Sequence, residues 1–243
     1  MIAIQGAAHY FHAMRGGESP PSLDDRLQAV RREHFRRVDR LIELALLGSG
    51  ECVAGKTLAP DCGLYISSGI GPIASNVVVQ DSVSRDAKLP MPFNFVNTLG
   101  SSAGYYVGKN LGLTGESIFV SRRGSAFSAV LACAVADIAS GLVSQALVGA
   151  IEECPLPLDR FRELVGFSAD AVAAEGSHWL LLANEAETGM PVAVEDPETQ
   201  EFNGYESRDA AVLASFAQRH PEMRLGLSFT NGAHVRLEVL ASR

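Results

Sequence analysis

The stretch "VSRRGSAFSAVLACAVADIASGLVSQALVGAIEE", residues 120–153, decides the fold. Between residues 126 and 150 it carries one charged residue, Asp137, and is otherwise dominated by small and apolar side chains. This pattern predicts a buried helix followed by a buried strand. Asp137 near the centre, the scattered serines and glycines, and the scarcity of large aliphatic side chains argue against a membrane span.

Two adjacent arginines, Arg122 and Arg123, precede this expected helix. Cations at the start of a helix oppose its macrodipole, which costs about 0.3–1 kcal/mol each. We therefore expect the two side chains to fill or seal a pocket, or to pair with carboxylates. Candidate partners are Glu152–Glu153 or carboxylates across an interface, where an ion pair offsets the penalty.

The composition is that of an ordinary globular protein of 243 residues, with 47% hydrophobic residues and a formal net charge of −8. The negative charge argues against a nucleic-acid binder, which needs a basic face. The four cysteines show no C-x-x-C spacing and no histidine pair has metal-ligand spacing, so we expect neither a disulfide framework nor a metal site. The N-terminus shows no secretory signal, and we expect a cytoplasmic protein.

Strands and helices alternate along the chain in an order that permits parallel pairing. A single amphipathic helix is expected over 22–50, started by Ser22 with Asp25 three residues later. A helix that is apolar on nearly every side needs cover on nearly every side, which predicts a layered α/β fold with the 125–143 helix between sheets. The other expected strands are 2–11, 62–71, 115–121, 145–153 and 175–187, and helices are expected over 72–87 and 208–220. The segment 90–113 is expected to form a Pro-rich loop and then a short helix, and the turn residues of 225–242 favour a hairpin.

The segment from Gly63 to Glu187 resembles the N-terminal half of β-ketoacyl synthases, which have the thiolase-like fold. "GLYISSGIG" is similar to the family's strand and glycine turn, and "GLTG" to its G-L-x-G motif. "ALVGAIEE" is similar to A-L-V-G-G-x-E, "EGSHWLLLANEAE" to E-G-A-A-x-L-V-L-E, and the tail "LSFTNGAHVRLEVL" to the Gly-rich terminus. The resemblance implies a half-fold over residues 1–187, with residues 188–243 as a short remnant of the second half packed on the same domain.

The departures from the family concern its catalytic residues. Aligning "RRGSA" with the family's T-A-C-A-S places Gly124 at the position of the nucleophilic cysteine. The half that carries the two catalytic histidines is largely missing, and His178, His220 and His234 are interpreted as structural. Ser125 is expected to be a helix N-cap rather than a nucleophile. Cys133 is expected to be an inert small hydrophobe within the helix.

A degenerate ketosynthase of this kind resembles the chain length factors of type II polyketide and aryl polyene systems. The resemblance implies a heterodimer with an active β-ketoacyl synthase, whose product tunnel this chain helps to shape, without metal or other cofactor. Its dimer contact follows the strand before the degenerate turn Arg122, Arg123, Gly124 and Ser125. The strand candidates are Glu116, Ser117, Ile118, Phe119, Val120 and Ser121, and the tunnel-lining candidates in the segment 80–97 are Phe93, Phe95 and Asn97.

Two alternatives stay open at the level of the sequence. One is an active enzyme that transfers or condenses acyl groups through Ser125, or that decarboxylates without a nucleophile. The other is a homodimeric scaffold that binds acyl carrier protein. Because carrier proteins are acidic, they would be attracted to the basic face Arg31–Arg40.

Overall fold

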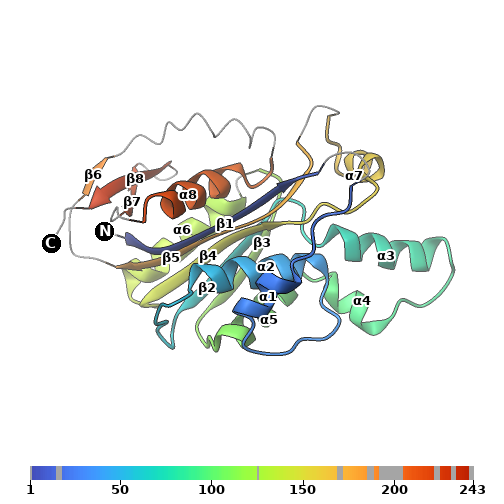
Figure 1. The fold of residues 1–243 in the computed structure, drawn as a ribbon, viewed down its shortest axis with the longest axis horizontal. Coiled ribbons are helices and arrows are strands. Elements are labelled where there is room, and N and C mark those ends of the chain that lie inside the picture. The colour runs from blue at the N-terminus through green and yellow to red at the C-terminus, as the bar shows by residue number, and fades with distance from the viewer. Residues whose placement is uncertain are drawn as a thin grey trace.

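The computed structural model describes residues 2–14, 18–124, 126–168, 172–184, 189–191, 205–221, 225–230 and 234–240. One mixed sheet of eight strands, in the order β3-β2-β4-β5-β1-β7-β8-β6, crosses the molecule (Figure 1). The strands are β1 (Ile2–Ala13), β2 (Gly63–Ser68), β3 (Ser117–Ser121), β4 (Gln145–Glu152), β5 (Ala174–Asn184), β6 (Gly189–Pro191), β7 (Leu225–Thr230) and β8 (His234–Leu240). This confirms an α/β fold.

Parallel pairing joins β3, β2 and β4, as the alternation of strands and helices predicts. Strand β5 runs antiparallel to both β4 and β1, so the carboxyl ends of β1, β2, β3 and β4 meet at one edge of the sheet with the start of β5. Strand β7 pairs with the first residues of β1, and so joins the C-terminal segment to the same sheet. Every candidate residue near the turn before 125 therefore lies at this carboxyl-end edge.

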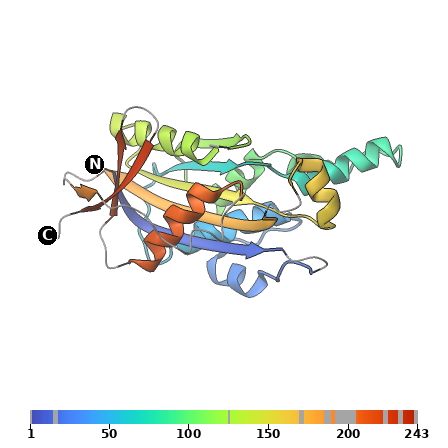
Figure 2. The same ribbon diagram turned by 90° about the horizontal axis from the view of Figure 1, so that it is seen from above.

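Helices cover both faces of the sheet (Figures 1 and 2). On one face, α2 and α5 enclose a core that includes Leu44, Leu47, Ile66 and Trp179. On the other face, α6 and α8 enclose a second core around Val130. The helices are α1 (Asp24–Val30), α2 (Arg40–Cys52), α3 (Ile73–Ser84), α4 (Pro92–Asn97), α5 (Ser101–Leu111), α6 (Ala126–Ser140), α7 (Leu158–Val165) and α8 (Arg208–Arg219).

Helix α6 is not enclosed between two sheets, and that expectation is wrong. It packs on the single sheet with one side, where Phe127, Val130 and Leu131 are buried. Ala132 and Cys133 on its outer side are exposed, so the interpretation of Cys133 as a buried small hydrophobe is also wrong. The small side chains of this helix reflect close packing on the sheet rather than cover on every side. Among the described helices, none combines the length and apolarity that crossing a membrane requires.

The helix expected over 22–50 is divided into α1 and α2 by a non-helical segment, residues 31–39. Arg37 adopts a positive φ of 59°, which a continuous helix does not permit. The Asn110 side chain accepts the N–H of Arg32 (2.8 Å), and the Asp39 carboxylate accepts that of Ile42 (3.1 Å) to begin α2. The N-cap of α1 is Leu23, not Ser22.

Helices α3 and α4 form an arm that projects beyond the rest of the molecule (Figures 1 and 2). Residues 92–97, expected as loop, form α4, with Pro92 in its first turn, where proline is compatible with a helix. Helix α3, expected over 72–87, is confirmed, but Ser75 is its one buried residue. Exposed large apolar side chains therefore gather here: Val78, Val83, Leu89, Met91, Phe95, Val96 and Leu99.

Candidate functional site

The turn between β3 and α6 offers no side chain at the position where a nucleophile is expected. Gly124 has a positive φ of 61°, which favours glycine, and a Cβ built on it would meet no atom within 4 Å. The turn therefore keeps room for a side chain that the sequence does not supply. Ser125, the alternative nucleophile or cap, lies outside the described residues.

Arg123 closes the turn by binding Glu206. Its Nε donates to the Glu206 carboxylate, while its Nη1 donates to the carbonyl of Val165. The guanidinium lies 4.9 Å from the ring centre of Phe167, a cation–π geometry. The backbone N–H of Gly124 also donates to Glu206, at 3.3 Å. Glu206 therefore occupies the start of α6 with its carboxylate, which offsets the cost of an arginine at that helix end.

The carboxylate that pairs with Arg123 is thus Glu206, and not Glu152 or Glu153, the candidates named from the sequence. Neither Glu152 nor Glu153 forms an ion pair with Arg122 or Arg123 among the described residues. Arg122 is exposed, and its backbone N–H donates to the carbonyl of Ser68 at 3.2 Å.

Three consecutive residues before α8 fasten the C-terminal segment to this edge, and we call Tyr205–Ser207 the strap. The Tyr205 hydroxyl contacts His178 Nε2 at 3.2 Å, and the Glu206 carboxylate accepts from Arg123. The Ser207 hydroxyl donates to Glu152 at 2.7 Å. Each side chain of the strap reaches a different element: β5, the turn before α6, and the end of β4.

Two buried carboxyl groups lie at the end of β4: Glu152 is the last residue of the strand, and Glu153 follows it. Glu152 accepts from the Ser68 hydroxyl, the Gly69 N–H and the Ser207 hydroxyl, yet burial raises its pKa to about 7. Burial raises the pKa of Glu153 to about 8, and the nearby Asp39 carboxylate adds to that rise. One oxygen of Glu153 accepts the Ala74 N–H at 2.8 Å, and the other has no hydrogen-bond partner. Burial among other carboxyl groups therefore favours the protonated form of Glu153.

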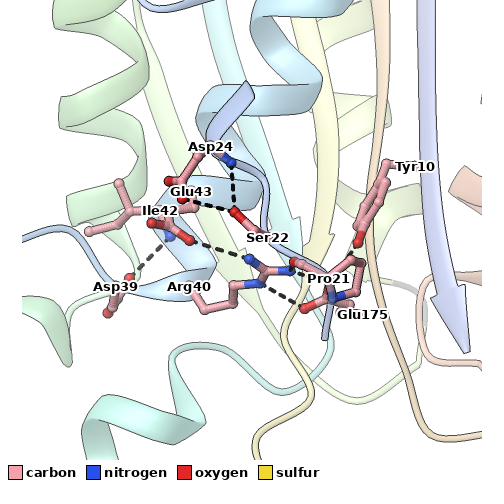
Figure 3. A network of polar contacts seen from close by, with 9 residues as sticks. All are labelled: Tyr10, Pro21, Ser22, Asp24, Asp39, Arg40, Ile42, Glu43 and Glu175. Carbon is pink, nitrogen blue, oxygen red and sulfur yellow. Dashed lines mark hydrogen bonds and ion pairs between the residues drawn. The ribbon is translucent and has the colours of Figure 1, made fainter. Parts of the chain in front are cut away.

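A third buried carboxylate, Glu175 at the start of β5, is paired (Figure 3). Both of its oxygens accept from Arg40, at 2.6 and 2.9 Å, and the Tyr10 hydroxyl donates to it at 2.7 Å. Arg40 also donates to the carbonyl of Pro21, so this bidentate pair joins β1, β5, α2 and the segment before α1. Burial and the Glu175 hydrogen bond raise the pKa of Tyr10, which keeps it a donor.

The histidines named from the sequence do not form a catalytic group at the turn. His178 is fully buried on β5, its Nδ1 lies 2.9 Å from His9 Nδ1, and burial lowers its pKa well below the usual value. His220 follows α8, with its ring 4.5 Å from that of Phe216. The side chain of His234 lies outside the described set. No group of three potential metal ligands occurs in the described part of the chain.

The tunnel candidates lie on the arm. Phe95 is 57% exposed, and Phe93 is partly buried beneath the Arg37 guanidinium, 5.3 Å from its ring centre. Asn97 is buried, with its amide directed at the Arg37 carbonyl at 3.5 Å. An apolar cavity of about 170 Å³ lies between α3 and α7, and Val78 is among the residues that line it.

The expected contact strand is confirmed as a strand and lies at one end of the sheet order. Strand β3 pairs with β2 alone among the described strands, so its other edge carries unpaired backbone groups. Such an edge favours addition of a further strand. Phe119 packs toward the α5 side, whereas Ile118 and Val120 pack toward α6.

The sequence reasoning missed the strap residues. Tyr205, Glu206 and Ser207 lie in a polar, turn-rich segment, and no local pattern connects them to β5, the turn or β4.

A family model decides the assignment: the N-terminal domain of β-ketoacyl synthases matches residues 9–175. The chain belongs to the β-ketoacyl synthase family. No curated protein is similar enough to this sequence to count as a match.

Solved structures of this family share the fold. A chain of the ishigamide ketosynthase/chain length factor has a TM-score of 0.65 and 12% identity, with 98% of each chain covered. A chain of the ketosynthase ApeO in complex with its chain length factor ApeC, from Xenorhabdus doucetiae, has a TM-score of 0.60 and 13% identity, with 99% of each chain covered. A complex of a type II polyketide acyl-carrier protein with its ketosynthase gives 0.56 and 18%, covering 75% of this chain and 58% of the other. At such identities these similarities establish the fold alone.

Proposed function

We propose that this β-ketoacyl synthase homologue is a non-catalytic partner, of the chain-length-factor kind, that forms a heterodimer with an active ketosynthase. In that role it shapes the tunnel into which the partner's acyl or polyene product grows, in a type II polyketide or fatty-acid-like pathway. The observation that carries the proposal is Gly124 at the nucleophile position, with the Glu206 carboxylate bound at the same turn.

The chemistry of the turn supports a non-catalytic role. A condensing enzyme needs a thiolate that is stabilised by a helix N-terminus, together with backbone N–H groups that stabilise the oxyanion. Here the N–H of Gly124 is directed at Glu206, and a carboxylate at this position would repel a thiolate or an oxyanion. Acyl transfer at this turn is therefore disfavoured twice, by the missing side chain and by the charge.

The arm supports a role in shaping a tunnel. Its exposed apolar residues include Leu89, which is 96% exposed, and Phe95, which is 57% exposed. An isolated soluble subunit rarely exposes so many large apolar side chains together. Within the proposed heterodimer, Phe93 and Phe95 lie against the partner's product tunnel and limit its length. The unpaired edge of β3 is the proposed contact strand.

Acyl carrier protein is the proposed second partner, and the basic segment 31–39 is its proposed contact. Arg32, Arg36 and Arg37 are exposed and form no ion pair with the described residues, in a chain whose net charge is −8. A local cationic face of this kind attracts an acidic protein from solution.

Co-expression with a ketosynthase from the same organism tests the proposal. We expect the two chains to co-purify as a 1:1 complex, and Phe93→Ala and Phe95→Ala to lengthen the product, with Val83→Ala on the same arm as control. Failure to co-purify with any ketosynthase of that organism contradicts the partner role. Intact-mass detection of an acyl adduct on the isolated chain, or turnover of a malonyl substrate by it, contradicts the non-catalytic role.

A further inference from the structure

A cavity of about 290 Å³, which we call the β1 cavity, lies beside the first residues of β1. It is at the other end of this strand from Phe11, on which Tyr205 of the strap packs. Strand β7 pairs with Ile2–Ile4 alone, and β1 forms a bulge between Ile4 and Gly6 directly afterwards. The C-terminal ends of α2 and α8, which cover opposite faces of the sheet, both line the cavity (Figures 1 and 2). Its volume is at the lower end of the range for small-molecule sites.

One side of the β1 cavity carries an unpaired cation, Lys56. The stem of this side chain lies along Gly6: a Cβ built there would be 2.6 Å from Lys56 Cε and 2.5 Å from the carbonyl oxygen of Cys52, so glycine is required. Lys56 is exposed and forms no ion pair with the described residues. The carboxylate of Glu51, which also lines the cavity, instead accepts two hydrogen bonds from Arg26, of 3.0 and 2.9 Å. The Lys56 ammonium is therefore available to an anionic group.

The opposite side carries the C-terminal end of α8, which favours a cation. In a continuing helix the carbonyl of Ala217 accepts the N–H four residues later, but that residue is Pro221, which has no N–H. The His220 N–H donates to the carbonyl of Phe216 at 3.1 Å, so the Ala217 carbonyl accepts no hydrogen bond from the described residues. Helix C-termini also carry a partial negative charge. An ammonium group is the matching ligand on this side.

Between the two sides lies main chain that no described strand pairs. The Met14 N–H donates to the carbonyl of Ala173 at 2.8 Å, which continues the ladder between β1 and β5. Backbone groups alternate in direction along a strand, and this register has no break from Gly6 to Ala13, so Ala7 directs its N–H and C=O away from β5. No described residue forms a hydrogen bond with these two groups. Ala7, which lines the cavity, therefore offers a donor and an acceptor to an amide group of a ligand.

These features match one chemical class of ligand. Ile4 and Leu225 give part of the cavity an aliphatic surface. A free α-amino acid carries both charges on one carbon, whereas an extended dipeptide separates them by about 7 Å and has a peptide group between them. We propose that the β1 cavity binds a zwitterionic dipeptide, whose carboxylate contacts Lys56, whose ammonium contacts the Ala217 carbonyl and whose peptide group contacts Ala7. This inference goes beyond the proposed function, which involves neither this cavity nor a peptide.

Titration of the isotope-labelled chain with L-alanyl-L-leucine, followed by NMR, tests the proposal. We expect saturable shifts of the Ala7 and Lys56 amide signals, with a dissociation constant below about 1 mM. N-acetyl-L-alanyl-L-leucine lacks the ammonium group, and L-alanyl-L-leucinamide lacks the carboxylate. Each blocked peptide should therefore bind about tenfold more weakly than the dipeptide, because a charge-assisted hydrogen bond is lost.

Two variants assign the two ends of the ligand. Lys56→Met keeps the stem that packs on Gly6 and removes the charge, so it should weaken binding of the dipeptide about tenfold and leave binding of the leucinamide unchanged. Pro221→Ala supplies the missing N–H to the Ala217 carbonyl, so it should weaken the dipeptide roughly threefold to tenfold and leave the N-acetyl form unchanged. Lys88→Met, at a lysine of the arm whose side chain is 75% exposed, is the matched control and should change neither affinity.

The absence of saturable shifts at about 10 mM dipeptide overturns the proposal. So do blocked peptides that bind as tightly as the dipeptide, or a Lys56→Met chain that binds the dipeptide with unchanged affinity. Shifts confined to residues far from the β1 cavity overturn it as well. These measurements use this chain alone, so their failure leaves co-purification with a ketosynthase, the test of the proposed function, unaffected.

Discussion

Arg123 binds Glu206 across 83 positions of sequence, at the turn that the resemblance to condensing enzymes aligns with their nucleophile. The contact joins the start of α6 to the segment that leads into α8. It places a carboxylate on the N–H of Gly124, at 3.3 Å. One ion pair therefore lies beside Gly124 at the turn before α6 and connects the C-terminal segment to the sheet.

Removing this pair should loosen the strap. Because Arg123 is 52% exposed and Glu206 12%, we expect Arg123→Ala and Glu206→Gln each to lower the free energy of unfolding by about 1 kcal/mol. Urea unfolding of the single and double variants measures the coupling between them. Arg85→Ala, which removes an exposed pair with Asp81 on the arm, is the control and should change little. Strictly additive losses for Arg123 and Glu206 would contradict the pairing.

A thiol placed at position 124 should report on the charge of Glu206. Gly124→Cys is tolerated sterically because no atom lies within 4 Å of the added Cβ, although the positive φ costs on the order of 1 kcal/mol. In a Cys133→Ser background, which removes the exposed native thiol, we expect Glu206→Gln to speed alkylation of this cysteine at pH 7. Loss of the carboxylate lowers the thiol pKa, by enough for a roughly three- to tenfold change in rate. Equal rates would show that Glu206 does not reach the site.

Stability should fall as the pH rises through the range in which Glu152 and Glu153 ionise. Their pKa values, about 7 and about 8, lie above the usual 4.5, so the folded state binds more protons than the unfolded state between these limits. The stabilisation is complete below pH 4.5 and is lost as pH approaches 8. His9, with its pKa lowered to about 4, acts in the opposite direction but only below about pH 6.5.

The window from pH 6.5 to 8 therefore reports mainly on the two glutamates, because the buried thiols of Cys52, Cys62 and Cys154, whose pKa values burial raises above 9.0, lower stability only at higher pH. We expect the free energy of unfolding to fall there by on the order of 1 kcal/mol, and Glu153→Gln to flatten the curve, since one Glu153 oxygen lacks a partner. Asp86→Asn, on an exposed residue of the arm, serves as the matched control. A curve that stays flat in the wild-type chain would contradict the buried, protonated state of Glu153.

Two glycine substitutions should change stability in opposite directions. A Cβ at Gly149 would lie 2.4 Å from the Trp179 ring, which is fully buried, so Gly149→Ala should cost about 1–3 kcal/mol. A Cβ at Gly108, within α5, would lie 4.0 Å from the carbonyl oxygen of Leu113, which is an ordinary van der Waals contact. Gly108→Ala should therefore stabilise the protein by about 0.5–1 kcal/mol. Fluorescence of Trp179, the single tryptophan, follows both unfolding transitions. Equal effects would mean that packing around Trp179 is looser than the structure has it.

The sequence predicted the elements that local patterns specify. The parallel strands β2, β3 and β4, the helix after Gly124 and the family itself could be read from apolar runs and motif order. The division of the 22–50 helix could not, because it depends on the Asn110 side chain, which is distant in sequence. The partner of Arg123 could not either, since Glu206 becomes its neighbour only after the C-terminal segment packs on the sheet. The one-sided burial of α6 could not be predicted either. It depends on whether another layer covers the outer side of the helix, and the composition of the helix does not encode this.

The strap also bears on how far this fold can be shortened. Its three side chains reach His178, Arg123 and Glu152, two of which are deeply buried polar groups. A truncated version ending after β5 would leave the imidazole and the carboxyl group facing a solvent-poor interior without their hydroxyl partners, at a cost of about 1–3 kcal/mol each. An engineer who wishes to graft this half-fold onto another protein must therefore carry the tail along with it.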